Sequence, residues 1–267
     1  MEIREAIILA AGESKRLSRY TGGLSKTLIK IFGVPLLLIP VRILHSIGVD
    51  RFIIVTKPDL KKRIKSILKK EKISYKIVVN RYSERENGYS LYLGLKAVHD
   101  NYFFLSMADH VYPASVPLKL LKDFGDNASI IIAGDSDPML IDIKEATKIL
   151  ANKDGEVIKI SKKLTDFNFI DAGVFIISKK VIKVAEFLER NLKVFSVADI
   201  VNFSISIGHK VKVSDITGIP WMEIDTVRDL RRLLYGLGRI VLRRVFEDLG
   251  ERLWLSESPR MELFRNT

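Results

Sequence analysis

Short apolar runs alternate with segments of helical periodicity through the first half of the chain. Runs typical of strands buried on both faces lie at 6–9, 52–56, 76–79, 102–106 and 127–133. Apolar residues spaced by three and four predict helices over 35–47, 59–70 and 88–98. This alternation of strands and helices predicts an α/β fold with a mostly parallel, mixed sheet flanked by helices.

The pattern changes near residue 139. Short strand-like pieces joined by turns are expected at 139–143, 147–151, 157–160 and 170–177, which predicts a small antiparallel excursion beside the main sheet. Two helices and a strand follow at 179–190, 197–206 and 210–214. Beyond Thr226, leucines and valines at spacings of three and four predict one long helix whose other faces carry arginines. We therefore divide the chain into a main domain, 1–232, and a basic helical extension, 233–267.

Composition narrows the class of protein. The chain has no cysteine, which excludes disulfides and thiolate zinc sites and agrees with a location in the reducing cytoplasm. No apolar stretch approaches the roughly 20 residues of a membrane span, and the first residues do not resemble a signal peptide. The net charge of +12 would suit nucleic acid, an anionic membrane or a polyanionic substrate. We expect no nucleic-acid binding, because no recognition helix or platform of interleaved aromatic residues is evident.

The stretch 9–26, LAAGESKRLSRYTGGLSK, follows the first predicted strand and is rich in Gly, Ser, Lys and Arg. Ligands of open α/β sheets collect at the carboxyl ends of the strands. Gly12 permits a tight turn that points backbone amides at an anion. Arg16, through a bidentate fork, and Lys26, as a mobile point charge, can neutralise a triphosphate. An ordinary basic surface loop is the alternative interpretation, since the P-loop pattern is absent.

Three motifs in a fixed order resemble the opening of the sugar-phosphate nucleotidyltransferases. They are LAAGESKRL at 9–17, SKTL at 25–28 and GVPL at 33–36, against the family pattern LAAGxGxRL, PK(x)L and Gx(P)L. This chain departs from the pattern at Ser14, where the family usually has glycine, and at Ser25, where it usually has proline. The resemblance implies that domain 1–232 has the Rossmann-like nucleotidyltransferase fold.

The same resemblance assigns roles within the loop and to two aspartates. It places the nucleotide against Ala10, Ala11 and Gly12 and its phosphates against Arg16 and Lys26. Asp109, at the end of an apolar strand, matches the family's first metal aspartate, and Asp225 in WMEIDT matches the second. Two such carboxylates would hold Mg²⁺, which brings two anionic phosphates together. Helix capping is the alternative for either residue, and for Asp225 the two roles are compatible.

Further stretches indicate the two substrates. NGYSL at 87–91 resembles the cytidylyltransferase branch, which implies CTP with Asn87 and Ser90 near the base or ribose; a capped helix start is the alternative. The segment 159–175 resembles the IGK(x)L…(Y/F)NxIDxGxF segment of archaeal CTP:inositol-1-phosphate cytidylyltransferases, with Ser161 in place of the glycine. That resemblance implies an acceptor site in which a lysine meets the phosphate and a carboxylate meets a ring hydroxyl. The implied substrate-binding residues are Lys162, with Lys163 in reserve, Asp171 and Gly173. A solvated turn is the alternative for the lysines, and we expect the four histidines to be structural or surface groups.

The implied reaction joins CTP to 1L-myo-inositol 1-phosphate, giving CDP-inositol and pyrophosphate for phospholipid biosynthesis. Phosphocholine is a second candidate acceptor if tyrosines form an aromatic cage, with candidates Tyr82, Tyr89, Tyr92 and Tyr112. A sugar 1-phosphate is a third candidate acceptor, and a regulatory subunit that has lost catalysis is the non-enzymatic interpretation.

The inositol enzymes that the chain resembles are often fused to a membrane CDP-alcohol phosphotransferase, whose DGxxAR signature is absent here. We expect a cytoplasmic protein with a possible link to such a partner at the inner membrane surface. For the arginine-rich helix after Thr226, packing on the body with arginines in water is favoured over lying on the membrane.

Overall fold

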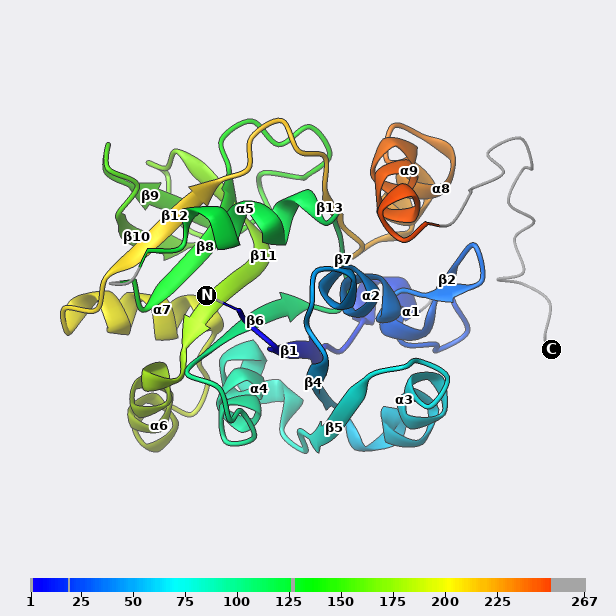
Figure 1. Ribbon diagram of the computed structural model, residues 1–267, viewed down its shortest axis with the longest axis horizontal. Coiled ribbons are helices and arrows are strands. Elements are labelled where there is room, and N and C mark those ends of the chain that lie inside the picture. The colour runs from blue at the N-terminus through cyan, green and yellow to red at the C-terminus, as the bar shows by residue number, and fades with distance from the viewer. Residues whose placement is uncertain (1, 19, 126–127, 251–267) are drawn as a thin grey trace.

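A nine-stranded sheet runs through the centre of the protein (Figure 1). The computed structural model describes residues 2–18, 20–125 and 128–250. Four neighbouring strands are mutually parallel, in the order β6, β1, β4, β5. Their bounds are β1 Glu5–Ala10, β4 Arg51–Thr56, β5 Ser74–Val79 and β6 Tyr102–Met107. All six residues of β1 are buried, as expected for a central strand covered on both faces.

One reversed strand joins this parallel half to the rest of the sheet. β11 (Phe169–Ser178) runs antiparallel to β6 on one side and to β8 (Ile130–Asp135) on the other, and β12 (Val211–Asp215) lies parallel to β8. The start of β11 also pairs with β9 (Lys148–Ala151), which pairs with β10 (Val157–Ser161). Because β11 is reversed, its beginning lies at the edge where the parallel strands end. This places the 159–175 region beside the loop that follows β1.

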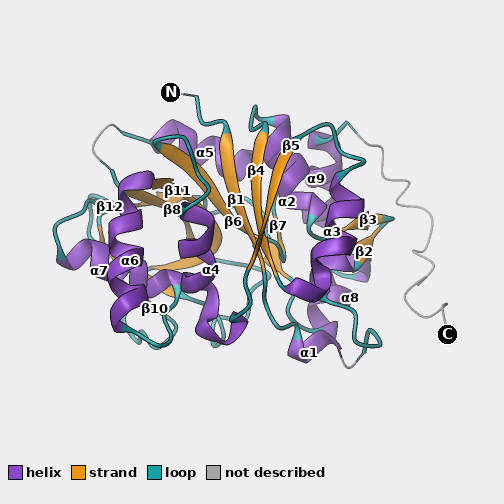
Figure 2. Ribbon diagram, turned by 90° about the horizontal axis from the view of Figure 1, so that it is seen from below, coloured by secondary structure: helices purple, strands orange, loops and turns teal. Residues whose placement is uncertain are grey.

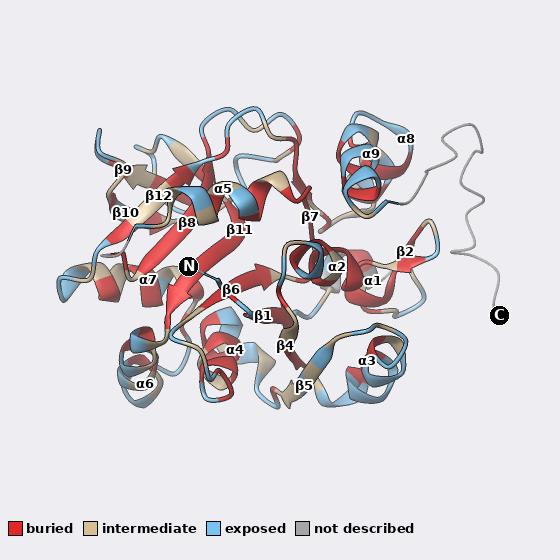
Figure 3. Cartoon of the chain, viewed as in Figure 1, coloured by how far each residue is buried: buried red, intermediate tan, exposed pale blue. Residues whose placement is uncertain are grey.

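Helices cover both faces of the sheet (Figure 2). One face packs against α4 (Glu86–Leu95), α6 (Ile182–Asn191) and α7 (Val197–Ser206). The other packs against α2 (Leu38–Ser46), α3 (Lys61–Leu68), α5 (Ser115–Asp123), α8 (Val227–Tyr235) and α9 (Arg239–Asp248). Short elements follow β1: α1 (Lys15–Ser18), a 3₁₀ turn (Lys26–Leu28) and the β2–β3 hairpin (Lys30–Ile31, Val34–Pro35). Figure 3 shows the buried residues concentrated in the sheet and on the inner sides of the helices. The predicted fold class is confirmed.

The strand predicted over 139–143 is wrong. This stretch is a series of bends and turns, and the loop continues to Ala146. The Asp142 side chain accepts a hydrogen bond from the backbone of Lys144, and the Asp142 carbonyl accepts from Glu145. Such local turn chemistry competes with strand pairing. Residue 127, at the start of the strand predicted over 127–133, lies outside the described residues, and β8 begins at Ile130.

The single long helix predicted after Thr226 is also wrong, because the chain breaks into α8 and α9. The amides of Gly236 and Gly238 both donate to the carbonyl of Arg232, which ends α8. A Cβ atom at Gly238 would lie 2.7 Å from the Leu233 Cα and 2.8 Å from the Met222 sulfur, so the turn requires glycine there. The boundary proposed at residue 232 falls inside α8, and residues 251–267 of the proposed extension lie outside the described residues. Along the described chain, no helix combines the length and apolarity needed to cross a bilayer.

Candidate active site

The loop after β1 is held by the two serines at which the chain departs from the family pattern. Ser14 has a φ of +54°, in the left-handed region that glycine adopts without strain. Its hydroxyl accepts a hydrogen bond from the Lys26 amide at 3.1 Å and lies 3.4 Å from the hydroxyl of Ser25. Ser25 itself has a φ of −62°, the value that proline would impose. The backbone therefore keeps the form that the family pattern requires, and the serine hydroxyls tie its two ends together.

A two-stranded antiparallel pair joins the two aspartates that are far apart in sequence. β7 (His110–Val111) pairs with β13 (Met222–Glu223), so that Glu223 lies opposite His110. The amide of Ile224 donates to the carbonyl of Asp109 at 2.9 Å. This pairing carries the WMEIDT motif to the end of β6 and sets Asp225 beside Asp109.

Asp225 is not the N-cap of α8. That position belongs to Thr226, whose hydroxyl accepts from the amide of Asp229 while the Asp229 carboxylate accepts from the amide of Thr226. Because this capping box satisfies the first turn, the carboxylate of Asp225 is left to face the loop. Of the two roles allowed for Asp225, capping is therefore excluded.

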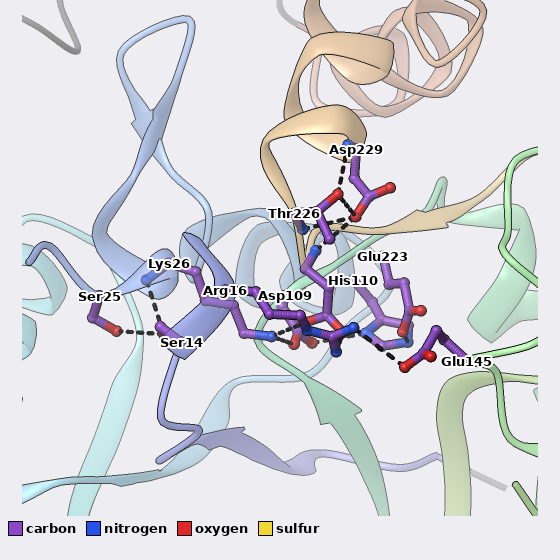
Figure 4. Close-up of polar contacts among 11 residues, drawn as sticks. Ser14, Arg16, Ser25, Lys26, Asp109, His110, Glu145, Glu223, Thr226 and Asp229 are labelled. Atoms are coloured by element: carbon purple, nitrogen blue, oxygen red, sulfur yellow. Dashed lines mark hydrogen bonds and ion pairs between the residues drawn. The ribbon is translucent and has the colours of Figure 1, made fainter. Parts of the chain in front are cut away.

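Lys26 lies between the two aspartates. Figure 4 shows it among the polar side chains of the site, with Asp109, His110 and Arg16. Its Nζ contacts one carboxylate oxygen of Asp109 and one of Asp225, and its side chain is only 12% exposed. Burial opposes the charged form of this lysine, but the two carboxylates outweigh it and raise the pKa of Lys26 above its usual value. Burial likewise opposes ionisation of Asp109, yet the Lys26 charge and a hydrogen bond with His110 hold the pKa of Asp109 well below its usual range.

Arg16 adds a second cation to this cluster. Its Nη2 lies 2.7 Å from Asp225 and its Nη1 lies 3.3 Å from Glu145, which belongs to the loop that replaces the predicted strand. Arg16 is half exposed, so it lies at the open side of the cluster, whereas Lys26 is enclosed. The arrangement suits two phosphate-binding cations, one half exposed and one enclosed, both held in place by carboxylates.

His110 forms the floor of the site. Its Nδ1 lies 2.8 Å from Asp109 and its Nε2 3.9 Å from Glu223, and its ring stacks on Trp221 at 6.0 Å between centroids. Trp221 in turn donates to the buried carboxylate of Asp135 at 2.8 Å. Burial opposes protonation of His110, but the bond with Asp109 and the surrounding carboxylates raise its pKa. We interpret His110 as the structural support of Asp109, in agreement with the expectation for the histidines.

The oxygen atoms of this cluster fit a hard divalent cation. Mg²⁺ is commonly held by one or two carboxylates together with substrate phosphates, rather than by a full set of protein ligands. Asp109 and Asp225 supply two such carboxylates, brought to one point around the Lys26 ammonium. The described residues contain no group of three or more His, Cys, Asp or Glu side chains arranged to hold a metal by themselves. Substrate oxygens would have to complete the coordination.

The residues predicted to bind the acceptor lie on the neighbouring side of the same edge. Asp171 is at the start of β11, pairs with Gly134 of β8 and accepts a hydrogen bond from the Gly173 amide at 2.8 Å. Burial raises the pKa of Asp171 to about 6, against the opposing effects of the Gly173 amide, His110 and Lys162. Gly173 has a φ of +71°, and a Cβ atom there would lie 2.6 Å from the His110 ring. Gly173 thus lets β11 approach the floor of the catalytic cluster.

Lys162 and Lys163 are exposed in the turn after β10. Lys162 is close enough to Asp171 to affect its pKa, whereas the backbone amide of Lys163 donates to the hydroxyl of Ser161. Because Ser161 pairs with Lys148 and Lys148 pairs with Ile170, the turn that carries Lys162 lies beside the start of β11. Binding of an acceptor by Lys162 and Asp171 stays a prediction.

Lys148 is a further residue of this region that the sequence reasoning did not identify. It is 8% exposed, and its Nζ donates to the carbonyl of Lys162 at 2.8 Å and to that of Ala146 at 3.4 Å. The same Nζ lies 5.8 Å from the centre of the Phe167 ring. A lysine inside the otherwise apolar stretch 147–151 was the available signal, because a buried cation needs partners. Here the partners are two main-chain carbonyls, that of Lys162 in the turn after β10 and that of Ala146 in the loop before β9.

The remaining residues predicted to bind the nucleotide lie at the end of β1 and in the first turns of α4. Ala10 and Ala11 are buried at the end of β1, and Gly12 follows. A Cβ atom at Gly12 would lie 4.0 Å from the Cε atom of Lys26, an ordinary van der Waals contact. Asn87 is exposed near the start of α4, where its side chain accepts from the amide of Val197 at 2.9 Å. Ser90 is buried and its hydroxyl accepts from Asn80 at 2.8 Å. Both α4 side chains thus make hydrogen bonds within the protein, and their contact with a base stays a prediction.

Comparison with known proteins places this geometry in a class. The chain is 34% identical over 232 residues to the "Bifunctional IPC transferase and DIPP synthase" of Archaeoglobus fulgidus, covering 87% of this chain and 43% of that protein. It is 26% identical to the choline-phosphate cytidylyltransferase of Streptococcus pneumoniae, covering 86% of this chain and 96% of that one. Among solved structures, the inositol-1-phosphate CTP transferase from T. maritima matches with a TM-score of 0.83 and 29% identity, over 94% of this chain and 98% of that chain. The chain spans about half the length of the bifunctional relatives that it matches.

These matches, together with a basic loop and two carboxylates at the carboxyl edge of the sheet, define a nucleotidyltransferase. The model of the MobA-like NTP transferase domain matches residues 6–167, and the chain belongs to that family. The predicted class of enzyme is confirmed.

Proposed function

We propose that this protein transfers the cytidylyl group of CTP to 1L-myo-inositol 1-phosphate and releases pyrophosphate. The observation that carries the proposal is the position of Lys26 between Asp109 and Asp225, directly beside the edge that holds Asp171. This geometry offers one place for a triphosphate and one for a polyol phosphate, side by side. The similarity to an inositol-1-phosphate CTP transferase over nearly the whole chain supports the choice of substrates.

The proposed reaction needs no general base. An oxygen of the acceptor phosphate, already anionic, attacks the α-phosphorus of CTP, and the bond from that phosphorus to the bridging oxygen of the β-phosphate breaks. Lys26 and Arg16 neutralise the triphosphate and the pyrophosphate that leaves. The chain's contribution is therefore positioning and charge neutralisation, which is the usual source of catalysis in phosphoryl chemistry.

Asp109 and Asp225 would hold Mg²⁺, which would supply charge neutralisation between the two anionic substrates. The Lys26 ammonium lies between these carboxylates and contacts both. Binding of the triphosphate would give the ammonium of Lys26 a second set of anionic partners. His110 keeps Asp109 oriented through Nδ1 throughout.

The acceptor would lie against Lys162 and Asp171. Lys162 would neutralise the incoming phosphate, and the Asp171 carboxylate would accept a hydrogen bond from a ring hydroxyl. Exchange of each lysine for methionine separates the two candidates: Lys162→Met should raise KM for inositol 1-phosphate strongly, and Lys163→Met only slightly. The reverse result would transfer the role to Lys163.

Phosphocholine is less well supported as acceptor. The Arg85 guanidinium lies 4.2 Å from the centre of the Tyr89 ring, and Lys96 Nζ lies 4.8 Å from that of Tyr92. Tyr112 is buried, with its hydroxyl 2.8 Å from that of Ser106. Three of the four candidate tyrosines are thus occupied by cations or buried in the core, which disfavours an aromatic cage built from them.

The first test is pyrophosphate release with Mg²⁺ for CTP, UTP, dTTP, ATP and GTP against inositol 1-phosphate, glucose 1-phosphate and phosphocholine. Turnover confined to CTP and inositol 1-phosphate is expected. Turnover with another acceptor would agree with a nucleotidyltransferase but contradict inositol 1-phosphate as its acceptor. Tight nucleotide binding without turnover for any pair would favour a regulatory subunit. Omission of Mg²⁺ should abolish turnover if the two aspartates act as proposed.

We further propose that the reaction serves phospholipid biosynthesis in the cytoplasm. The product would be consumed by an enzyme that transfers an alcohol phosphate from a CDP-alcohol, in a separate chain or in a further part of a longer one. Expression with and without a candidate CDP-alcohol phosphotransferase, followed by analysis of inositol-containing products, would test this link.

A further inference from the structure

The helices α8 and α9 present two different surfaces. Their inner sides are apolar and buried, and Phe246 of α9 meets Phe32 edge to face at 6.3 Å. Their outer sides carry arginines at helical spacing. These are Arg228, Arg231 and Arg232 on α8, and Arg239, Arg243 and Arg244 on α9. The buried inner sides agree with the prediction that this region packs on the body of the protein. The outer sides, however, expose apolar side chains as well as arginines.

Apolar side chains are exposed where the two helices meet. Leu237, between Gly236 and Gly238 in the connecting turn, is 79% exposed. Tyr235 at the end of α8 is 48% exposed, and Ile240 in the first turn of α9 is 47% exposed. Scattered exposed apolar residues need no explanation, but three within six positions, bordered by arginines, form an amphipathic surface. We call Tyr235, Leu237, Ile240 and the arginines of α8 the basic corner.

A hollow lies on the α8 side of the basic corner. It has a volume of about 490 Å³ and is lined by Tyr20 of the loop after β1 and by α8 and its end. The lining residues from α8 and its end are Val227, Arg228, Arg231, Arg232, Tyr235 and Gly236. Arg228 and Arg231 have no ion-pair partner among the residues that the structure describes. Three arginine side chains border this hollow, and guanidinium groups can bind a phosphate through paired hydrogen bonds.

We infer that the basic corner docks on an anionic lipid surface, with lipid phosphates at the arginines and Leu237 and Ile240 entering the boundary of the acyl chains. Three observations fit this occupant together: the arginines that lack ion pairs within the described chain, the exposed aliphatic side chains beside them, and a tyrosine between the two. Tyrosine with one apolar and one polar end is suited to the membrane interface. The inference does not depend on which acceptor the enzyme uses.

A second basic helix provides the comparison. α3 carries Lys61, Lys62, Arg63 and Lys65; of its apolar residues, Ile64 and Leu68 are buried and Ile67 is partly buried. No large apolar side chain of α3 is among the exposed ones. If charge alone decided binding, α3 and the basic corner would bind equally well. Of these two surfaces, the basic corner is the one that also exposes large apolar side chains. Figure 3 shows the exposed parts of both.

The test is co-sedimentation of the full chain with vesicles of phosphatidylcholine, with or without phosphatidylglycerol. The wild-type protein should sediment with the anionic vesicles and not with the neutral ones. Leu237→Ser/Ile240→Ser and Arg228→Gln/Arg231→Gln should each bind the anionic vesicles on the order of tenfold more weakly. Lys61→Gln/Lys62→Gln, which removes the same charge from α3, should bind as the wild type does. Far-UV circular dichroism and thermal melting confirm that each variant is folded.

Several outcomes would overturn the inference. Equal weakening by the α3 variant would mean diffuse attraction by net charge. Absence of binding to either vesicle, or binding unaffected by Leu237→Ser/Ile240→Ser, would exclude an inserted corner. Inorganic phosphate that binds the wild type and not Arg228→Gln/Arg231→Gln, with no vesicle binding, would identify a site for a soluble anion. A dimer in size-exclusion chromatography that Leu237→Ser/Ile240→Ser converts to a monomer, again without vesicle binding, would assign the corner to a second copy.

Discussion

The nucleotide side and the acceptor side of the site are built in different ways. On the nucleotide side, charged groups meet directly: Lys26 contacts Asp109 and Asp225, and Arg16 contacts Asp225. On the acceptor side, Lys162 is exposed in a turn, and the buried Lys148 beneath it bonds only to main-chain carbonyls in the described contacts. On the nucleotide side, charged side chains hold one another in position. On the acceptor side, a buried lysine holds the backbone of the turn that carries the charged Lys162. Substitutions should therefore damage the two sides differently, the first through kcat and the second through KM of the acceptor.

The largest effect is expected for Lys26→Met. It removes the cation between two carboxylates and the enclosed charge opposite the triphosphate, so kcat should fall by on the order of 10³-fold. Loss of the Lys26 charge should also raise the pKa of Asp109, which NMR titration can follow. The matched control is Lys30→Met, an exposed lysine of the nearby hairpin, which should leave kcat unchanged. An unchanged kcat for Lys26→Met would contradict the role of direct charge contacts on the nucleotide side.

The backbone of the nucleotide side could be predicted from the sequence because the information that specifies it is local. The loop from Ala10 to Lys26 and the strand before Asp109 each specify a backbone form through neighbouring residues, and the structure has that form. The meeting of Asp109 with Asp225 is not local, since it depends on the pairing of β7 with β13. The two aspartates were brought together by the resemblance to a known family, and not by the periodicity of the sequence. Even the departures at Ser14 and Ser25 could not be interpreted separately, because the two hydroxyls act on each other and on Lys26.

The sequence predicted less of the acceptor side because tertiary packing decides it. The turn at Asp142 replaces an expected strand and delivers Glu145 to Arg16, a contact across 129 positions that no periodicity reveals. Lys148 had the appearance of an ordinary polar residue in a short strand. Gly236 and Gly238 broke the predicted long helix because α8 and β13 approach closely there. In each case a contact between distant segments overrode a local preference.

An intermediate effect is expected for Lys148→Met, which tests the acceptor side. The substitution keeps the buried volume but leaves the carbonyls of Lys162 and Ala146 without their donor, so the turn that carries Lys162 should lose its position. KM for inositol 1-phosphate should rise by about tenfold, a loss of about 1.4 kcal/mol, while KM for CTP stays the same.

The control for this prediction is Lys153→Met, an exposed lysine in the turn between β9 and β10. It should change neither constant. A fall in kcat without a change in the acceptor KM would mean that Lys148 supports the fold in general rather than the acceptor turn. A partial return of the acceptor KM in Lys148→Arg would support the role of a donor at this position.

A smaller effect is expected from pH, through Asp171. Burial raises the pKa of this carboxyl to about 6, so the carboxylate that accepts the ring hydroxyl is lost as the pH falls below that value. KM for the acceptor should rise below pH 6, approaching roughly tenfold per pH unit at the limit. Because phosphomonoesters also titrate at about pH 6, the diagnostic is the difference between wild type and Asp171→Asn. The variant should have a higher KM at neutral pH and should lack the part of the pH dependence that belongs to the protein.

The sign of the stability effect is opposite to that of ordinary salt-bridged carboxyls. The folded pKa of about 6 lies above the reference value of 3.8, so the folded state binds this proton more tightly than the unfolded state. The associated stability is present below 3.8 and is lost as the pH rises through 6. Asp171→Asn should therefore melt at a temperature that depends less on pH over this interval. Identical pH profiles for both proteins would contradict the assignment of the raised pKa to Asp171.

The smallest effect is expected for the exchange of both serines for the residues of the family pattern, Ser14→Gly and Ser25→Pro. Glycine relieves the left-handed conformation at position 14, worth about 1 kcal/mol, but loses a hydrogen bond to the Lys26 amide of about the same size. Proline fits the φ of −62° at position 25 and removes freedom from the unfolded chain, while the 3.0 Å contact with the hydroxyl of Thr27 is lost. Melting temperature and kcat of the double variant should therefore stay close to those of the wild type. A large loss of kcat with an unchanged melting temperature would show that the hydroxyls themselves serve the reaction. The nucleotide side would then depend on polar contacts that maintain the backbone, as the acceptor side does.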